Sequence, residues 1–264
     1  MSKLINALSG ENPWINTSYF FHGFAANQAD DSKFRDISGN PNDGAFGANL
    51  SIANAWATAG YVSTVDPTGG ATDSVIRIPA VNLDYNAGES LLFWWLGRIT
   101  PEGSAVEFAG DGGFNTTYPG WGIRVNTAGT AQIKLSDATN TYFSATSSGT
   151  AFIASTLKSI GILIKSNEKK AYLWIDDALD SNFTSGSTLN SGNAIDTRTT
   201  NTVNIGTTLP ASAASTTGIV TQTRACAILK FGVGQAVPTS AQITNAFAAL
   251  RRNPSRPLLK TAFS

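Results

Sequence analysis

Cysteine, histidine and methionine are nearly absent from this chain of 264 residues, in which each occurs once, as Cys226, His22 and Met1. A single cysteine excludes an internal disulfide framework, and the apolar run around Cys226 favours a buried, unreactive side chain. One histidine and one cysteine also exclude a zinc site with the usual nitrogen and sulfur ligands. Because His22 stands in an aromatic run, we expect a structural histidine rather than a member of a catalytic triad.

Charge is also scarce, since charged residues make up 14% of the chain against roughly 25% in an ordinary soluble domain. The 18 basic and 18 acidic residues balance, and no basic stripe is present to neutralise phosphates, which excludes nucleic acid as a partner. No run approaches the roughly 20 apolar residues of a membrane span. Residues 1–6 lack the apolar core of a secretion signal, so we expect synthesis in a cytoplasm without export.

The chain is instead rich in short β-type runs, separated by clusters of Gly, Asn, Asp, Ser and Thr. Residues 90–99 are apolar on both faces, which predicts a central strand. Residues 120–125 and 131–136 alternate between apolar and polar side chains, as half-buried strands do. Residues 158–165 and 170–176 flank a polar turn and predict a hairpin. Further strands are expected at 202–206 and 227–233, and the fold class is therefore all-β, a two-sheet antiparallel sandwich.

One short C-terminal helix is expected after Pro238, because Ile243, Phe247 and Leu250 recur at helical spacing. Thr239 or Ser240 can cap its first turn, and Asn253-Pro254 ends it. The predicted organisation is an N-terminal arm over residues 1–18, one sandwich domain over 19–252 and a C-terminal tail over 253–264.

The order of four segments resembles the laminin-G-like (concanavalin A-like) jelly-roll family over residues 19–252. The third segment departs from the family pattern, because Asp177 stands where a glycine is expected, so the turn there could be of another type. The resemblance implies a jelly roll but little about function, since this sandwich hosts lectins, hydrolases and phage structural proteins. The four segments are the D-x-S-G-N-x-N-D-G stretch at 36–44, the aromatic strand at 90–95, the hairpin strand at 172–177 and the closing strand, link and helix at 228–243.

Carboxylates that could act as a glycoside-hydrolase pair are few. Glu107 and Asp111 are four residues apart, but Gly110 indicates that the strand has already ended before Asp111. Asp176 and Asp177 are adjacent, and their side chains would point apart on a continuous strand. We interpret both pairs as loop and turn carboxylates and predict that the chain is not an enzyme.

Two stretches could bind a ligand. Asp36, Asn40 and Asp43 could offer oxygen ligands to calcium, although a network of Asx turns explains them more simply. No other cofactor is expected. The loop between Asp111 and Trp121 carries Phe114, Asn115 and Tyr118, which could form an aromatic and amide platform for a sugar. Trp121 itself begins an alternating strand, which favours a core position.

The first functional hypothesis is a structural protein of a bacteriophage virion: a head decoration, head fibre or tail-associated protein. The uncharged, hydroxyl-rich composition, the absent export signal and the terminal arms favour it, and Arg251-Arg252-Asn253-Pro254 resembles the ends of phage-encoded members of the family. Its partners would be other virion proteins, contacted through the arms, and a cell-surface glycan. We expect a homo-oligomer, as shell and fibre proteins usually are. The alternative is a free carbohydrate-binding module.

Overall fold

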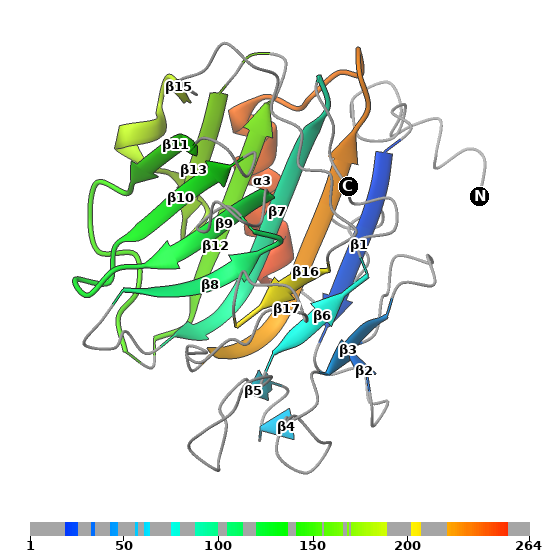
Figure 1. Ribbon diagram of the computed structural model, residues 1–264, viewed down its shortest axis with the longest axis vertical. Helices are drawn as coiled ribbons and strands as arrows, with labels where there is room; N and C mark the ends of the chain where they lie inside the picture. Colours follow the sequence, from blue (N-terminus) through cyan, green and yellow to red (C-terminus); the bar gives the residue numbers. More distant parts are fainter. Residues whose placement is uncertain are drawn as a thin grey trace.

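The structure is a computed structural model, and it describes a β-sandwich covered on one side by a short helix (Figure 1). Every strand pairing among the described residues is antiparallel. The described residues are 19–25, 33–34, 43–46, 56–57, 61–63, 75–79, 88–99, 105–112, 120–136, 141–154, 156–165, 168, 170–188, 202–206 and 221–252.

The nine-stranded sheet is built around two long strands, β7 (Ser90–Ile99) and β17 (Thr221–Phe231). Its order is β14-β13-β12-β7-β17-β5-β4, with β1 beside β17 and β15 beside β13. β7 is buried on both faces because it is central and lies between two packed layers, as its apolar run predicts. The remaining strands are β1 (Tyr19–Ala25), β4 (Trp56–Ala57), β5 (Tyr61–Ser63), β12 (Lys158–Lys165), β13 (Lys170–Ile175), β14 (Ala178–Leu179) and β15 (Ser187–Thr188).

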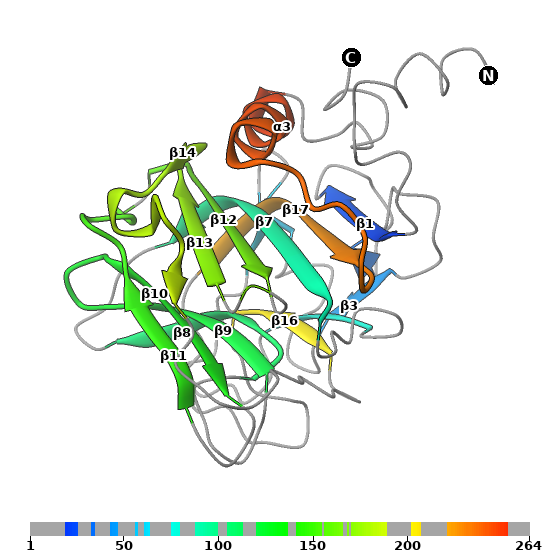
Figure 2. The same cartoon turned by 90° about the horizontal axis from the view of Figure 1, so that it is seen from above.

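The eight-stranded sheet packs against the first with its apolar side (Figure 2). Its order is β11-β10-β9-β8-β16-β6-β3-β2. Trp121, Ile123 and Val125 of one strand share the core with Ile133 and Leu135 of the next, which confirms the alternation predicted for both segments. The strands are β2 (Lys33–Phe34), β3 (Gly44–Phe46), β6 (Ile76–Ile78), β8 (Val106–Gly110), β9 (Gly120–Val125), β10 (Ala131–Ser136), β11 (Thr141–Thr146) and β16 (Val203–Ile205).

A third layer is formed by helix α3 (Ser240–Arg252), which lies on the outer face of the nine-stranded sheet (Figure 2). The helix begins with a capping box: Thr239 Oγ1 accepts from the Gln242 amide at 3.3 Å, and Gln242 Oε1 accepts from the Thr239 amide at 3.0 Å. Its apolar stripe, which includes Ile243, Phe247 and Leu250, is buried against Leu92, Trp94, Leu163 and Trp174.

The antiparallel jelly-roll sandwich with one short C-terminal helix is therefore confirmed. One bound differs clearly from the prediction, because β17 begins at Thr221 rather than at 227. The segment after β14 contains the 3-10 turn η1 (Ser181–Phe183) and β15. Cys226 is buried, as expected. The side chain of His22 and the predicted arm and tail lie outside the described residues. Within the described part, no helix is long and apolar enough to cross a membrane.

Candidate functional site

The outer face of the eight-stranded sheet carries most of the polar side chains that its strands contribute. Because successive residues of a strand point to opposite faces, apolar residues at every second position of β6, β9, β10 and β16 leave the intervening polar residues outside. We call this surface the polar face, made of Lys33, Arg77, Glu107, Arg124, Gln132, Lys134, Ser136, Ser144, Thr146 and Asn204.

The strand register aligns the polar face into a row across the sheet. Arg77 pairs with Asn204 on the neighbouring strand, and Asn204 pairs with Gly110 on its other side. Gly110 in turn pairs with Gly122, and Gly122 pairs with Lys134. Four inter-strand steps of about 4.8 Å place the Arg77 and Lys134 backbones roughly 19 Å apart. The two glycines leave the middle of the row without side chains. Gly110 is required by packing as well, since a Cβ there would lie 2.2 Å from the Trp121 carbonyl oxygen.

One end of the row is buried and preorganised by hydrogen bonds. Asn204 is fully buried and Arg77 is 8% exposed. Asn204 Oδ1 accepts from Arg77 Nη1 at 3.1 Å and from the Thr202 hydroxyl. When a buried guanidinium donates a hydrogen bond to an amide oxygen, that bond offsets part of the free-energy cost of burying the charge. This end of the row therefore has a fixed geometry.

The other end of the polar face is partly open to solvent. Glu107 and Arg124 are cross-strand neighbours, both half-buried, and Gln132 lies opposite Arg124 on the next strand. Gln132 Nε2 donates to the exposed Ser144 hydroxyl at 2.8 Å. Guanidinium, carboxylate, amide and ammonium groups within one sheet surface can hydrogen-bond pairs of hydroxyl groups, which is the chemistry needed to hold a sugar ring.

The loop predicted to bind sugar begins and ends at this sheet. Phe114, Asn115 and Tyr118 lie outside the described residues, so their role stays a prediction. The base of the loop is rigid: Asp111 donates its amide to the Trp121 carbonyl at 3.0 Å, and its Oδ1 accepts from the Trp121 amide at 2.7 Å.

The Glu107 and Asp111 carboxylates occupy different environments. The prediction that the strand ends before Asp111 is confirmed, because the last residue of β8 is Gly110. Asp111 is 1% exposed and accepts a hydrogen bond from the backbone of β9, whereas Glu107 stands on the polar face. The Asp111 side chain thus joins the end of β8 to the beginning of β9.

Of the residues proposed to bind calcium, Asp36 and Asn40 lie outside the described part of the chain. Asp43 is half-buried, and its Oδ2 lies 3.8 Å from the Lys33 ammonium. The described residues contain no group of three or more His, Cys, Asp or Glu side chains that could hold a metal ion. The calcium assignment stays a prediction.

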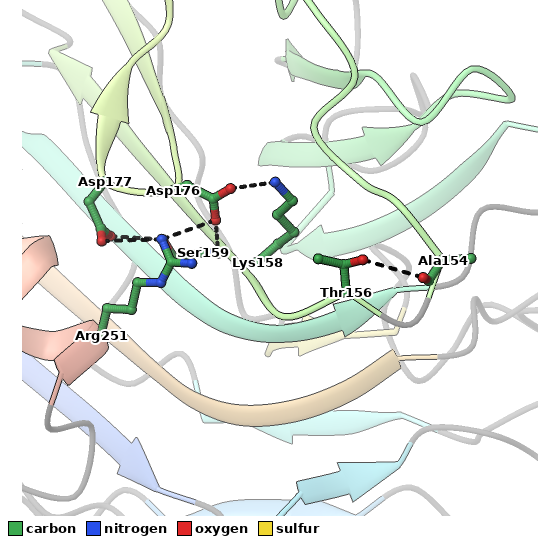
Figure 3. Close-up of polar contacts among 7 residues, drawn as sticks. All are labelled: Ala154, Thr156, Lys158, Ser159, Asp176, Asp177 and Arg251. Carbon is green, nitrogen blue, oxygen red and sulfur yellow. Dashed lines mark hydrogen bonds and ion pairs between the residues drawn. The ribbon is translucent and has the colours of Figure 1, made fainter.

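Asp176 and Asp177 form the turn between β13 and β14, which confirms their interpretation as turn carboxylates. Their φ angles are 50° and 68°, and Ile175 pairs with Ala178 across the turn. Positive φ at both central residues is what a type I′ hairpin requires, so Asp177 adopts the conformation that a glycine would have. The carboxylates do not point apart but share Arg251 of α3, at 3.2 Å and 3.6 Å (Figure 3).

Sequence reasoning missed both the polar face and the role of Arg251. Arg77 and Asn204 are 127 residues apart, and only the strand register places them side by side. Arg251 stands in the last turn of its helix, where a basic side chain usually complements the C-terminal end of that helix. The signal available in the sequence was the charge of Asp176 and Asp177, without an indication of their partner.

No protein-family model and no curated protein sequence matches the chain. Among solved structures, it is similar to a Trypanosoma rangeli sialidase with 2,3-difluorosialic acid as a covalent intermediate (TM-score 0.58, 12% identity, 96% of this chain and 39% of that chain). It is also similar to the same enzyme in complex with 2,3-difluoro-KDN, with a TM-score of 0.55 and 13% sequence identity. That match covers 88% of this chain and 33% of the sialidase. A Ruminococcus gnavus sialidase CBM40 bound to α2,3-sialyllactose matches at a TM-score of 0.44 and 13% sequence identity. That match covers 60% of this chain and 82% of the CBM40 chain. The chain thus spans well under half of the trypanosomal sialidase, and the likeness concerns the fold alone.

Proposed function

We propose that this chain is a non-catalytic, lectin-like module that binds carbohydrate through the polar face of its eight-stranded sheet. The observation that carries the proposal is the cross-strand group of partly exposed polar side chains, Glu107, Arg124, Gln132 and Lys134. The buried Arg77 and Asn204 fix the geometry of the same sheet surface but are not themselves accessible to a sugar. Planar side chains held by a rigid sheet lose little conformational entropy when they hydrogen-bond a sugar. The site therefore suits reversible recognition of hydroxyl groups.

The choice of carbohydrate is supported by the solved structures that share the fold, because the trypanosomal neighbours are sialidases with sialic-acid-type compounds bound. The choice of binding over hydrolysis is supported by the carboxylates. Asp111 is buried in backbone contacts, and Asp176 and Asp177 are occupied by two cations and a serine. Neither pair offers a proton donor beside a nucleophile across an open space of about 5–9 Å.

A glycan array probed with the full chain tests the proposal, with sialylated, sulfated and neutral glycans and with calcium present or chelated. We expect binding to at least one class, and a loss of roughly tenfold in affinity for Arg124→Ala and for Lys134→Ala, because each removes a charged hydrogen-bond donor. The control is Arg252→Ala, which removes the same charge from an exposed position on α3. An array without binding in either condition, or variants that bind as the wild type does, would exclude this site.

The second candidate is a structural role in a bacteriophage virion, as a head decoration, fibre or tail-associated protein. The observation that favours it is the composition, in which uncharged polar residues replace charged ones. The two roles are compatible, since a virion protein can also bind a host glycan. Immunolabelling of purified particles tests this candidate: label on the virion supports it, and unlabelled virions would rule it out.

A further inference from the structure

The strained turn at Asp176–Asp177 is joined to the C-terminal end of α3 by a closed network of charges. Each carboxylate oxygen of the turn has a partner. Asp176 Oδ1 faces Arg251 Nη1 at 3.2 Å and the Ser159 amide at 3.3 Å, and Asp176 Oδ2 pairs with the Lys158 ammonium. Asp177 Oδ1 accepts from the Ser159 hydroxyl at 2.8 Å, and its Oδ2 faces Arg251 at 3.6 Å.

The conformation of this turn indicates that the carboxylates are present for their charge. A left-handed φ costs a residue with a side chain roughly 1 kcal/mol or more, and Asn-Gly is the favoured pair in such a turn. Two aspartates are therefore a poor local choice for the backbone. The network of two anions and two cations offsets the strain, and Arg251 is the cation in it that contacts both carboxylates (Figure 3).

The rest of the helix is held differently. Its first three turns bury Ile243, Ala246 and Phe247 against the sheet, and Trp174 Nε1 donates to Thr244 Oγ1 at 3.0 Å. Arg251 and Arg252 follow Leu250, the last residue of the buried stripe. Arg252 donates its Nε to the Ala248 carbonyl within the same helix at 3.1 Å. Among the described contacts, the ion pairs of Arg251 are thus the polar link between the last turn and the sheet.

We infer that the Asp176–Asp177 turn is an electrostatic latch that fastens the end of α3 to the nine-stranded sheet, so that salt or loss of a charge opens this end before the sandwich unfolds. The side chains of the latch are partly exposed: those of Asp176, Asp177 and Arg251 are 28%, 13% and 33% exposed. Because these side chains are partly exposed, salt screens the attraction between their charges. Salt has no such effect on the apolar contacts that the first three turns of α3 make with the sheet. This inference is independent of carbohydrate binding.

Hydrogen–deuterium exchange on the full chain tests the latch by comparing peptides that cover 240–252 with peptides that cover 90–99. Arg251→Gln should raise exchange in 240–252 by roughly three- to tenfold and leave 90–99 unchanged. The matched control is Arg252→Gln, which removes the same charge from the next position and should change neither peptide. About 1 M salt, with a Debye length of ~3 Å, should loosen the wild-type helix but have no further effect on Arg251→Gln.

A second variant separates a latch from an ordinary turn. Asp177→Gly removes the carboxylate and relieves the backbone strain at a φ of 68°. If the turn only connects two strands, this change should increase protection of α3. The latch predicts the opposite, namely faster exchange in 240–252. Equal exchange in Arg251→Gln and Arg252→Gln, or greater protection in Asp177→Gly, would overturn the inference.

Discussion

Gly161→Ala is expected to destabilise the domain by about 3 kcal/mol, although replacing a glycine by alanine inside a strand usually stabilises a protein. Gly161 pairs with Trp94 on one side and Trp174 on the other, and the Phe247 ring of α3 fills the space above it. A Cβ on Gly161 would lie 2.1 Å from that ring, and the ring is confined by Trp94 at 6.3 Å and Trp174 at 5.7 Å between ring centroids. The helix has to move to admit one methyl group.

Denaturant unfolding of a double-mutant cycle measures this interaction. Phe247→Ala alone should cost about 4 kcal/mol through the cavity it leaves. Because the shortened side chain no longer occupies the space above Gly161, the double variant should cost little more than Phe247→Ala alone. The control is Gly149→Ala, since a Cβ there meets nothing within 4 Å. Additive losses in the double variant would mean that Gly161 is needed for a reason other than Phe247.

The long strands could be predicted because their pattern is local. Residues 90–99, 120–125 and 131–136 have the bounds expected from their burial patterns, since each buries a complete face or both faces. Strands of two or three residues, such as β2 and β6, carry no such period and are held by the neighbours with which they pair. Local sequence therefore contains little information about them.

The turn at residues 176–177 shows a second limit of sequence reasoning. The missing glycine suggested another turn type, yet both aspartates adopt positive φ because contacts from β12 and α3 compensate for the strain. The polar face was missed for a related reason. Lys134, Arg124 and Asn204 are unremarkable in the sequence, and only the register of five strands brings them onto one surface. The predicted sugar-binding residues Phe114, Asn115 and Tyr118 are not tested by the described structure.

Asp180→Ala is expected to cost about 3 kcal/mol, because this carboxylate ties the two sheets together at one edge. Asp180 is 8% exposed and follows β14 of the nine-stranded sheet. It caps η1 by accepting from the Asn182 amide at 2.9 Å, and it accepts from the Ser148 amide and hydroxyl just after β11 of the other sheet, at 3.0 Å and 2.9 Å. Alanine would leave these donors at a partly buried site without their acceptor.

The free energy of unfolding in denaturant should rank three variants if this explanation holds. Asp180→Asn keeps one oxygen acceptor and should lose about half as much stability as Asp180→Ala. Glu168→Ala removes a carboxylate whose side chain is 46% exposed and forms an ion pair with Lys165 three residues earlier, so its loss should stay below about 0.5 kcal/mol. Similar losses for Asp180→Ala and Glu168→Ala would contradict the assignment, because removal of a surface charge would then account for both. A large loss confined to position 180 would instead mean that the two sheets depend on a carboxylate as well as on their shared apolar core.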